Sequence, residues 1–217
     1  KNNFVAKLGI ELINKKTDLI LHKPNSSILF DERLKVKNSS SNNLIINDID
    51  LIFEKEKKVD ALICNFDLQI LLVNNAQNLC KNIYKTLNKN GFFCFNLLTL
   101  NSFRTIQKIF LEIDDHVFNG AQLRFGPFHN IPNIISELND NKFKEVVVST
   151  ENIEVNYKSL NKIRKDFKKL GISNYYKEKS RTNKKFYKKT TSLFRELVAK
   201  HDFIPVEIEI STFTSWK

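Results

Sequence analysis

Apolar and polar positions along the chain follow two periods, which predict helices and strands in alternation. Residues 3–16 carry apolar side chains at the three- and four-residue spacing of a helix that buries one face. Further helices are predicted at 74–88, 101–114, 131–141, 158–170 and 181–201. Short continuous apolar runs are typical of strands in a parallel sheet covered on both faces. Such runs occupy 19–21, 28–30, 44–46, 59–64 and 92–97.

Two later segments complete the predicted sheet. Residues 146–155 are strand-like, and residues 206–213 alternate apolar and polar side chains, which indicates a half-exposed strand near a sheet edge. Strands that alternate with helices predict a layered α/β fold. A chain of 217 residues can bury a substantial core, and we expect a single domain over residues 1–217.

The charge of the chain favours anionic partners without choosing among them. The 35 Lys and Arg against 24 Asp and Glu give a net charge of +11. This balance suits nucleic acid, acidic proteins, phosphorylated ligands or an anionic membrane. The richness in Lys, Asn, Ile and Phe is also what an AT-biased genome produces, so the charge alone is weak evidence.

Several classes of function find no support in the sequence. The three cysteines have no C-x-x-C spacing, which fits reduced thiols in a cytoplasmic protein, and the four histidines show no spacing typical of metal ligands. No nucleophile-elbow pattern is present. No apolar run approaches the ~18 residues of a membrane span, and no signal-peptide pattern opens the chain. The first residue is Lys rather than Met, so a preceding segment is left open.

The middle of the chain resembles a known family. Residues 58–98 contain a strand, a helix and the turn and strand LNKNGFF, in the order found in class I methyltransferases that use S-adenosylmethionine. Motifs in the C-terminal half resemble one subfamily, which holds the malonyl-carrier-protein O-methyltransferases of biotin biosynthesis and the complex I assembly proteins described as arginine hydroxylases. These motifs are TLNSFR at 99–104, RFGPF at 124–128, IEVNY at 153–157, LGISN at 170–174, Arg181 and SWK at 215–217.

The resemblance implies a Rossmann-like sheet of seven strands with helices on both faces and ligand at the carboxyl ends of the strands. Residues 156–203 would form a helical lid before the last strand. The substrate mouth would be lined by Arg104, Arg124, Tyr157, Asn174 and Arg181. Arginine can hold a carboxylate or phosphate with two hydrogen bonds. The alternative is that Tyr157 is a core residue and the arginines form surface pairs.

The glycine-rich cofactor turn of this family is missing where the first strand is expected. Residues 19–26 read LILHKPNS, with no glycine and with a proline that removes a backbone donor. About six polar residues separate the runs 19–21 and 28–30, too few for a crossover helix, so the first βα unit is predicted to be shortened. The remaining candidates for cofactor binding are His22, Asn25, Asp31, Asp48, Asn65 and Gln69. Asp31 and Asp48 can also be read as solvated loop acids.

Three functions remain open. The first is a methyltransferase-like protein that has lost normal adenosylmethionine binding and acts as a binding or assembly factor for an acidic protein, such as a carrier protein or an assembly partner. The second is a divergent adenosylmethionine-dependent methyltransferase or a related enzyme, in which catalysis depends mainly on holding the reactants in line. The third is nucleic-acid binding through a basic segment with interleaved aromatics, which can also be a solvated helix face. That segment contains Tyr175, Tyr176, Lys177, Lys179, Arg181, Lys184, Lys185, Phe186, Tyr187, Lys188 and Lys189.

Overall fold

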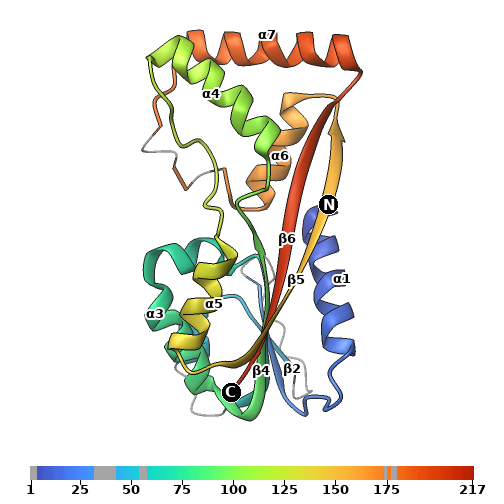
Figure 1. Ribbon diagram of the computed structural model, residues 1–217, viewed down its shortest axis with the longest axis vertical. Helices are drawn as coiled ribbons and strands as arrows, with labels where there is room; N and C mark the ends of the chain where they lie inside the picture. Colours follow the sequence, from blue (N-terminus) through green and yellow to red (C-terminus); the bar gives the residue numbers. More distant parts are fainter. Residues whose placement is uncertain (1–3, 32–42, 54–57, 174, 177–179) are drawn as a thin grey trace. The chain divides into compact units, whose positions relative to one another are not determined.

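The computed structural model describes residues 4–31, 43–53, 58–173, 175–176 and 180–217. The elements follow one another along the chain as α1 (Phe4–Asp18), β1 (Ser27–Phe30), β2 (Asn43–Ile46), α2 (Ile49–Phe53), β3 (Val59–Asn65), α3 (Leu68–Thr86), β4 (Leu87–Leu98), α4 (Arg104–Phe118), α5 (Ile131–Asp140), β5 (Lys144–Tyr157), α6 (Leu160–Lys169), α7 (Lys184–His201) and β6 (Ile204–Trp216). The alternation of strands and helices confirms the predicted α/β fold (Figure 1).

The chain divides into two compact units. We call residues 2–99, 129–151 and 210–217 the sheet unit, and residues 1, 100–128 and 152–209 the helical unit. The predicted lid, 156–203, holds α6 and α7 and lies wholly within the helical unit. Its role as a lid and the single domain over 1–217 stay predictions.

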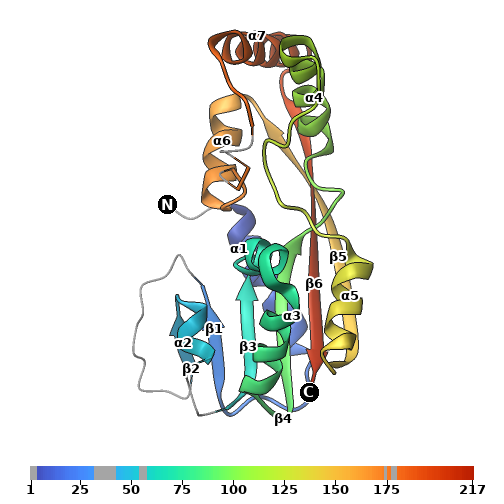
Figure 2. The same cartoon turned by 90° about the vertical axis from the view of Figure 1, so that its left-hand side faces the viewer.

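The strands form one sheet in the order β2-β1-β3-β4-β6-β5. The first four pair in parallel, with Phe30 opposite Ile46 and Cys64, and β6 runs antiparallel to β4 (Figure 2). The family resemblance implied seven strands, whereas the described residues form six. The expectation that 206–213 lies half-exposed near an edge is wrong, because β6 is an inner strand and is largely buried, and β5 is the edge strand.

The prediction of a strand at 19–21 is wrong. Helix α1 ends at Asp18, and the residues that follow form a loop in which Leu19 is 75% exposed and Leu21 is 94% exposed. The first strand is β1, and the connection from β1 to β2 is residues 31–42, of which 32–42 lie outside the described residues. Twelve residues are about the minimum for a parallel crossover. The shortened βα unit predicted between residues 21 and 28 is therefore wrong, because residues 19–21 form no strand; the connection that follows β1 also contains no glycine.

Helices cover both faces of the sheet unit. On one face, α3 and α5 pack over a core that contains Phe30, Phe93 and Phe95, and the rings of Phe93 and Phe95 stack with centroids 4.4 Å apart. On the other face, Ile13 of α1 packs against Ala61, Phe92 and Cys94. Figure 1 shows α1 on the side of the sheet opposite α3 and α5. The predicted two-sided covering of the sheet is confirmed.

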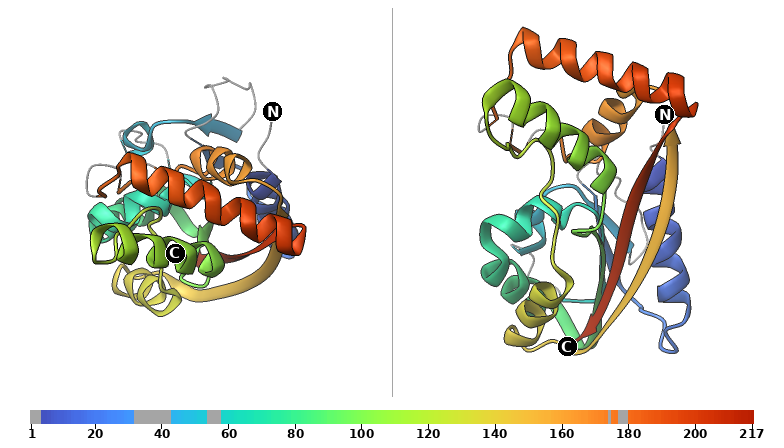
Figure 3. Two further views of the ribbon diagram at one scale, coloured as in Figure 1. Left: turned by 90° about the horizontal axis from the view of Figure 1, so that it is seen from above. Right: turned by 45° about the horizontal axis from the view of Figure 1, so that its top comes forward.

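The helical unit has its own aromatic core. The ring of Phe167, from α6, lies with its centroid 4.6 Å from that of Phe103 and 4.7 Å from that of Phe125. Phe186 and Phe194 of α7 pack against Phe110 of α4. Figure 3 shows α7 lying across α4.

Candidate cofactor edge of the sheet

Ligands of open α/β sheets bind at the carboxyl ends of the parallel strands. Four of the predicted cofactor residues lie at this edge of the sheet unit. Asp31 follows β1, Asp48 follows β2, Asn65 ends β3 and Gln69 lies in the first turn of α3. With residues 19–21 predicted as the first strand, Asp31 would follow the second strand. The structure places Asp31 after the first strand, and the acid that follows the second strand is Asp48.

Asn65 and its neighbour Asn96 in β4 are bonded to helix α1. The Asn65 Nδ2 donates to the carbonyl oxygen of Ala6 at 2.8 Å, and the Asn96 Nδ2 donates to that of Gly9 at 2.6 Å. Thr212 donates to the Asn96 Oδ1 at 2.6 Å. Both asparagine side chains are fully buried, so their amides are committed to the interior of the sheet unit.

Gly9 permits this close approach of α1. A Cβ atom at Gly9 would lie 2.3 Å from the Asn65 Oδ1 and 2.5 Å from the Phe66 Cε2, distances that real Cβ atoms do not reach. Because a glycine in a helix interior lowers helix stability, it needs a packing reason. Here the reason is contact with the carboxyl end of β3.

Gln69 joins α3 to β4. Its Nε2 donates to the Leu98 carbonyl at 2.9 Å, and its Oε1 accepts from the Leu98 N–H at 2.8 Å. The His129 Nε2 lies 2.7 Å from the Gln69 backbone oxygen, which can only accept, so this nitrogen carries a proton. Burial lowers the pKa of His129, against the smaller opposing effect of this bond. Gln69 is 2% exposed and acts as a structural link.

The two acids differ in their exposure. Asp31 is 4% exposed, and its N–H donates to the Ile46 carbonyl at 3.0 Å. Asp48 is exposed, and its Oδ1 accepts from the Asp50 N–H at 3.0 Å at the start of α2. Asp48 is thus the more accessible carboxylate at this edge.

His22 and Asn25 lie at the opposite edge of the sheet. They precede β1 and line a cavity of about 710 Å³ together with Asp60, Phe92 and Trp216. The Asn25 N–H donates to the Asp60 carboxylate at 3.0 Å. The structure therefore does not bring these two residues together with the other four candidates, and the reason is that the first strand begins later than the sequence suggested.

Two of the predicted substrate residues are engaged inside the helical unit. The Arg124 Nε lies 2.9 Å from each carboxylate oxygen of Asp114, and its guanidinium carbon lies 3.7 Å from the centroid of the Phe186 ring. Tyr157 is 1% exposed and its hydroxyl donates to Asp166 at 3.0 Å, while burial raises its pKa. Both side chains have the geometry of core residues.

The other three predicted substrate residues are placed differently. Arg104 is exposed and donates to the Asn101 Oδ1. Arg181 is exposed, and its backbone N–H donates to the Gln122 Oε1 at 2.6 Å. Asn174 lies outside the described residues, as do Lys177 and Lys179 of the basic segment. Phe186 of that segment is 3% exposed, so it is not open for base stacking.

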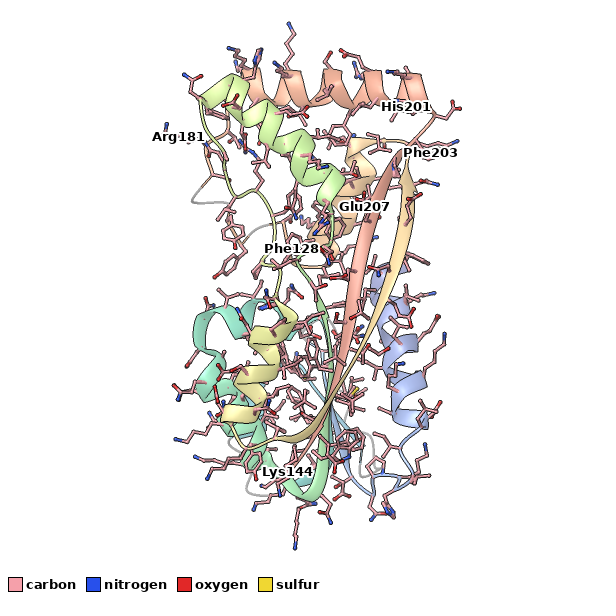
Figure 4. All side chains as sticks on the ribbon, viewed as in Figure 1. Phe128, Lys144, Arg181, His201, Phe203 and Glu207 are labelled. Atoms are coloured by element: carbon pink, nitrogen blue, oxygen red, sulfur yellow. The ribbon has the colours of Figure 1, made fainter. Side chains whose placement is uncertain are left out.

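Two glutamates were missed by the sequence reading. Glu207 and Glu209 project from the same side of β6, and Thr105 donates to Glu207 through its hydroxyl at 2.7 Å and its N–H at 3.2 Å. Asn101 donates to Glu209 at 2.9 Å. Burial acts to raise the pKa of Glu207, but the Thr105 bonds and Lys108 outweigh it and the pKa is lowered. Figure 4 shows Glu207 beside the first turn of α4. Glutamates two apart in a predicted strand share a face, which was the available signal.

Neither a metal-binding cluster nor a membrane-spanning helix is found among the described residues. No cluster of three or more His, Cys, Asp or Glu side chains there could hold a metal ion. Within the same ranges, every helix is too short or too polar to cross a membrane.

Solved structures resemble this chain at low sequence identity. No family model matches the chain. The crystal structure of YcgJ from Bacillus subtilis has a TM-score of 0.53 at 8% identity, over 97% of this chain and 98% of that one. An S-adenosylmethionine-dependent methyltransferase from Archaeoglobus fulgidus has a TM-score of 0.49 at 10% identity, over 98% and 94% of the two chains.

Two curated proteins are similar in sequence. "Putative methyltransferase RP459" of Rickettsia prowazekii is 27% identical over 71% of this chain and 66% of its own length. "Arginine-hydroxylase NDUFAF5, mitochondrial" of Dictyostelium discoideum is 21% identical over 80% of this chain and 40% of its own length. The chain spans less than two thirds of either relative. The chain has a Rossmann-like α/β fold similar to that of YcgJ, and its sequence is similar to a putative methyltransferase and to an arginine hydroxylase.

Proposed function

We propose that this protein is a methyltransferase-like binding or assembly factor that does not bind S-adenosylmethionine in the normal way. The observation that carries the proposal is the packing of α1 onto the carboxyl end of β3, where Asn65 is fully buried and donates to the Ala6 carbonyl. The absence of glycine from residues 31–42 supports it, because a cofactor turn needs backbone that passes close to the ligand.

The cost of opening this edge can be set against the affinity of a small ligand. Separating α1 from the sheet breaks the hydrogen bonds that Asn65 and Asn96 donate to α1. The free-energy cost is about 2 kcal/mol for each buried amide that loses its partner. A ligand whose dissociation constant is about 1 μM has a binding free energy of about −8 kcal/mol. A loss of about 4 kcal/mol moves its dissociation constant to about 1 mM. Adenosylmethionine binding at this edge is therefore expected to be very weak.

Calorimetry with adenosylmethionine and adenosylhomocysteine tests this part of the proposal. We expect at most a weak, non-saturating heat at millimolar ligand, which corresponds to a dissociation constant of about 1 mM or more, and the same response from the Asp31→Asn and Asp48→Asn variants. A dissociation constant below about 100 μM, near −5.5 kcal/mol, would contradict the proposal. A class I methyltransferase of known affinity, titrated in the same buffer, shows that the ligand is intact.

The partner that we propose is an acidic protein. The helical unit contains 19 Lys and Arg and 10 Asp and Glu, a net charge of +9, whereas the sheet unit has 16 and 14, a net charge of +2. Many of these lysines are exposed on α6 and α7, namely Lys162, Lys165, Lys168, Lys169, Lys184, Lys185 and Lys188. A positive surface of this kind raises the association rate with a negatively charged partner.

An acidic carrier protein is a suitable probe for this surface. Binding should weaken as salt rises, and the double variant Lys184→Glu/Lys188→Glu should weaken it further. The matched control is Lys81→Glu/Lys85→Glu on α3, where both lysines are also exposed but belong to the sheet unit. Equal losses from the two double variants would show that only net charge matters and would argue against a docking surface on α7.

A second candidate is a divergent methyltransferase. The observation in its favour is the exposed Asp48 after β2, where dinucleotide-binding sheets place the acid that holds ribose hydroxyls. If this candidate is correct, the calorimetry gives measurable binding and Asp48→Asn weakens it by roughly tenfold or more, the size of a lost charged hydrogen bond.

A further inference from the structure

The loop that joins α1 to β1 exposes apolar side chains at the amino edge of the sheet unit. We call residues 19–24 the tip loop. Leu21, at 94%, and Leu19, at 75%, are the two most exposed large apolar side chains in the described parts of the chain. Val147 of β5 is 55% exposed and lines the same cavity as the tip loop. Single exposed apolar residues are ordinary, but a group of them indicates an interaction site.

Hydrogen bonds hold the base of the tip loop in place, so its leucines are exposed from an ordered loop. The Asp60 Oδ2 accepts from the N–H groups of Asn25 and Ser26, both at 3.0 Å, and from the Ser26 hydroxyl at 3.2 Å. The Asn88 Nδ2 donates to the Asp60 Oδ1 at 2.7 Å. These bonds, that from Asn88 first, lower the pKa of Asp60 and keep it ionised at neutral pH.

Lysines lie at the same edge of the sheet unit as the tip loop. They come from the end of α1, from the loop itself and from the starts of β3, β4 and β5, and are Lys16, Lys23, Lys58, Lys89 and Lys144. Lys217 is engaged instead, because its Nζ donates to the Leu87 carbonyl at 2.7 Å and lies over the Tyr84 ring. Among the described residues, the acids at this edge are Asp18, whose Oδ1 lies 3.8 Å from the Lys23 Nζ, Asp60 and Glu145. Figure 4 shows Lys144 where β5 begins. The edge therefore combines a small apolar tip with an excess of positive charge.

Trp216 completes the set. It is the single tryptophan of the chain and lines the cavity with Leu19 and Leu21. Tryptophan favours the boundary between lipid and water, where its ring is partly buried and its N–H stays hydrated. Lysine side chains next to such a boundary extend their ammonium groups toward lipid phosphates.

We propose that the amino edge of the sheet unit binds the surface of an anionic lipid bilayer. Leu19 and Leu21 enter the boundary between headgroups and acyl chains, and the lysines at the same edge lie against the phosphates. A protein partner fits less well, because stable protein interfaces bury about 1,200–2,000 Å² around an apolar core. Two leucines on a narrow loop with lysines at the same edge are instead typical of shallow insertion into a membrane.

Vesicle flotation combined with tryptophan fluorescence tests the proposal. The full chain is mixed with vesicles of phosphatidylcholine alone or with about 30% phosphatidylglycerol, in about 0.1 M salt. We expect flotation with the anionic vesicles only, and a blue shift and quenching of Trp216 emission by brominated lipid. The double variant Leu19→Ser/Leu21→Ser should bind roughly tenfold or more weakly.

The matched control is Leu123→Ser, because Leu123 is 65% exposed but lies in the helical unit. All three substituted leucines are exposed, so the melting temperatures of the variants should match that of the parent. The proposal is overturned if the parent does not float with anionic vesicles. It is equally overturned if the double leucine variant floats as the parent does, since binding would then come from charge alone. A Trp216 shift that depends on protein concentration without lipid would indicate self-association instead.

Discussion

Gly9→Ala tests whether α1 is held against the carboxyl end of β3 by close packing. An alanine Cβ would lie 2.3 Å from the Asn65 Oδ1, 2.5 Å from the Phe66 Cε2 and 3.0 Å from the Asn96 Nδ2. Neither asparagine can move away easily, because both side chains are fully buried. The helix itself must therefore shift, and the bonds to the carbonyls of Ala6 and Gly9 are lost or stretched.

The magnitude follows from opposing effects. Alanine in place of a helix-interior glycine normally stabilises by about 0.5–1 kcal/mol. Two buried amides left without their partners cost about 1–3 kcal/mol each. The net result is a destabilisation of about 3 kcal/mol. At about 2–4 °C for each kcal/mol in a chain of this length, the melting temperature falls by about 6–12 °C.

The measurement is urea unfolding and a thermal melt of Gly9→Ala beside a matched glycine variant. Gly120→Ala is that control, because a Cβ there meets no atom within 4 Å. It should be neutral or stabilising by up to about 1 kcal/mol. If Gly9→Ala is as stable as Gly120→Ala, the close contact between α1 and β3 is not present, and the argument against adenosylmethionine binding fails with it.

Three further results are expected. Burial lowers the pKa of His129 in the folded state, so the unfolded chain binds more protons below about pH 6.5 and the stability should fall as the pH drops through this range. The His129→Gln variant should therefore show a flatter dependence of melting temperature on pH. An unchanged slope would mean that another group causes the pH dependence. Arg124→Ala should lower the free energy of unfolding by about 3–5 kcal/mol because Asp114 stays buried without its partner, and adding Asp114→Ala should recover part of this loss in urea titrations. Burial raises the pKa of Cys80 to about 12 and of Cys94 to about 11, so mass spectrometry should find neither thiol alkylated by iodoacetamide until the chain unfolds.

The sheet was predictable because its inner strands are continuous apolar runs. Residues 59–64 and 92–97 are covered on both faces, so all their positions except Asp60 and Asn96 are apolar. The run 19–21 is also apolar but lies in a loop. Three apolar residues in a row do not tell whether other parts of the chain cover them, so this loop could not be distinguished from a strand. Only contacts with distant residues, such as Asp60 with Ser26, fix where β1 begins.

The candidate site was predictable only in part. Asp31, Asp48 and Asn65 lie at the carboxyl edge because they end, or lie within two residues of the end of, strands that could be recognised. The hydrogen-bond partners of these side chains could not be predicted from the local sequence pattern, because Asn65 donates to a residue 59 positions away. Gly9 offered a weak signal, because a lone glycine in an amphipathic helix calls for a packing reason.

The two units share their longest strands. The boundary between the units falls between Glu151 and Asn152 within β5, and between Glu209 and Ile210 within β6. Exchanging residues 100–128 and 152–209 for those of a relative would need four junctions, two of them inside a β-ladder. A single crossover or insertion cannot replace the helical unit. Its charge is therefore open to change mainly by point substitution, and chimaeras with related proteins should be built on whole chains rather than on modules.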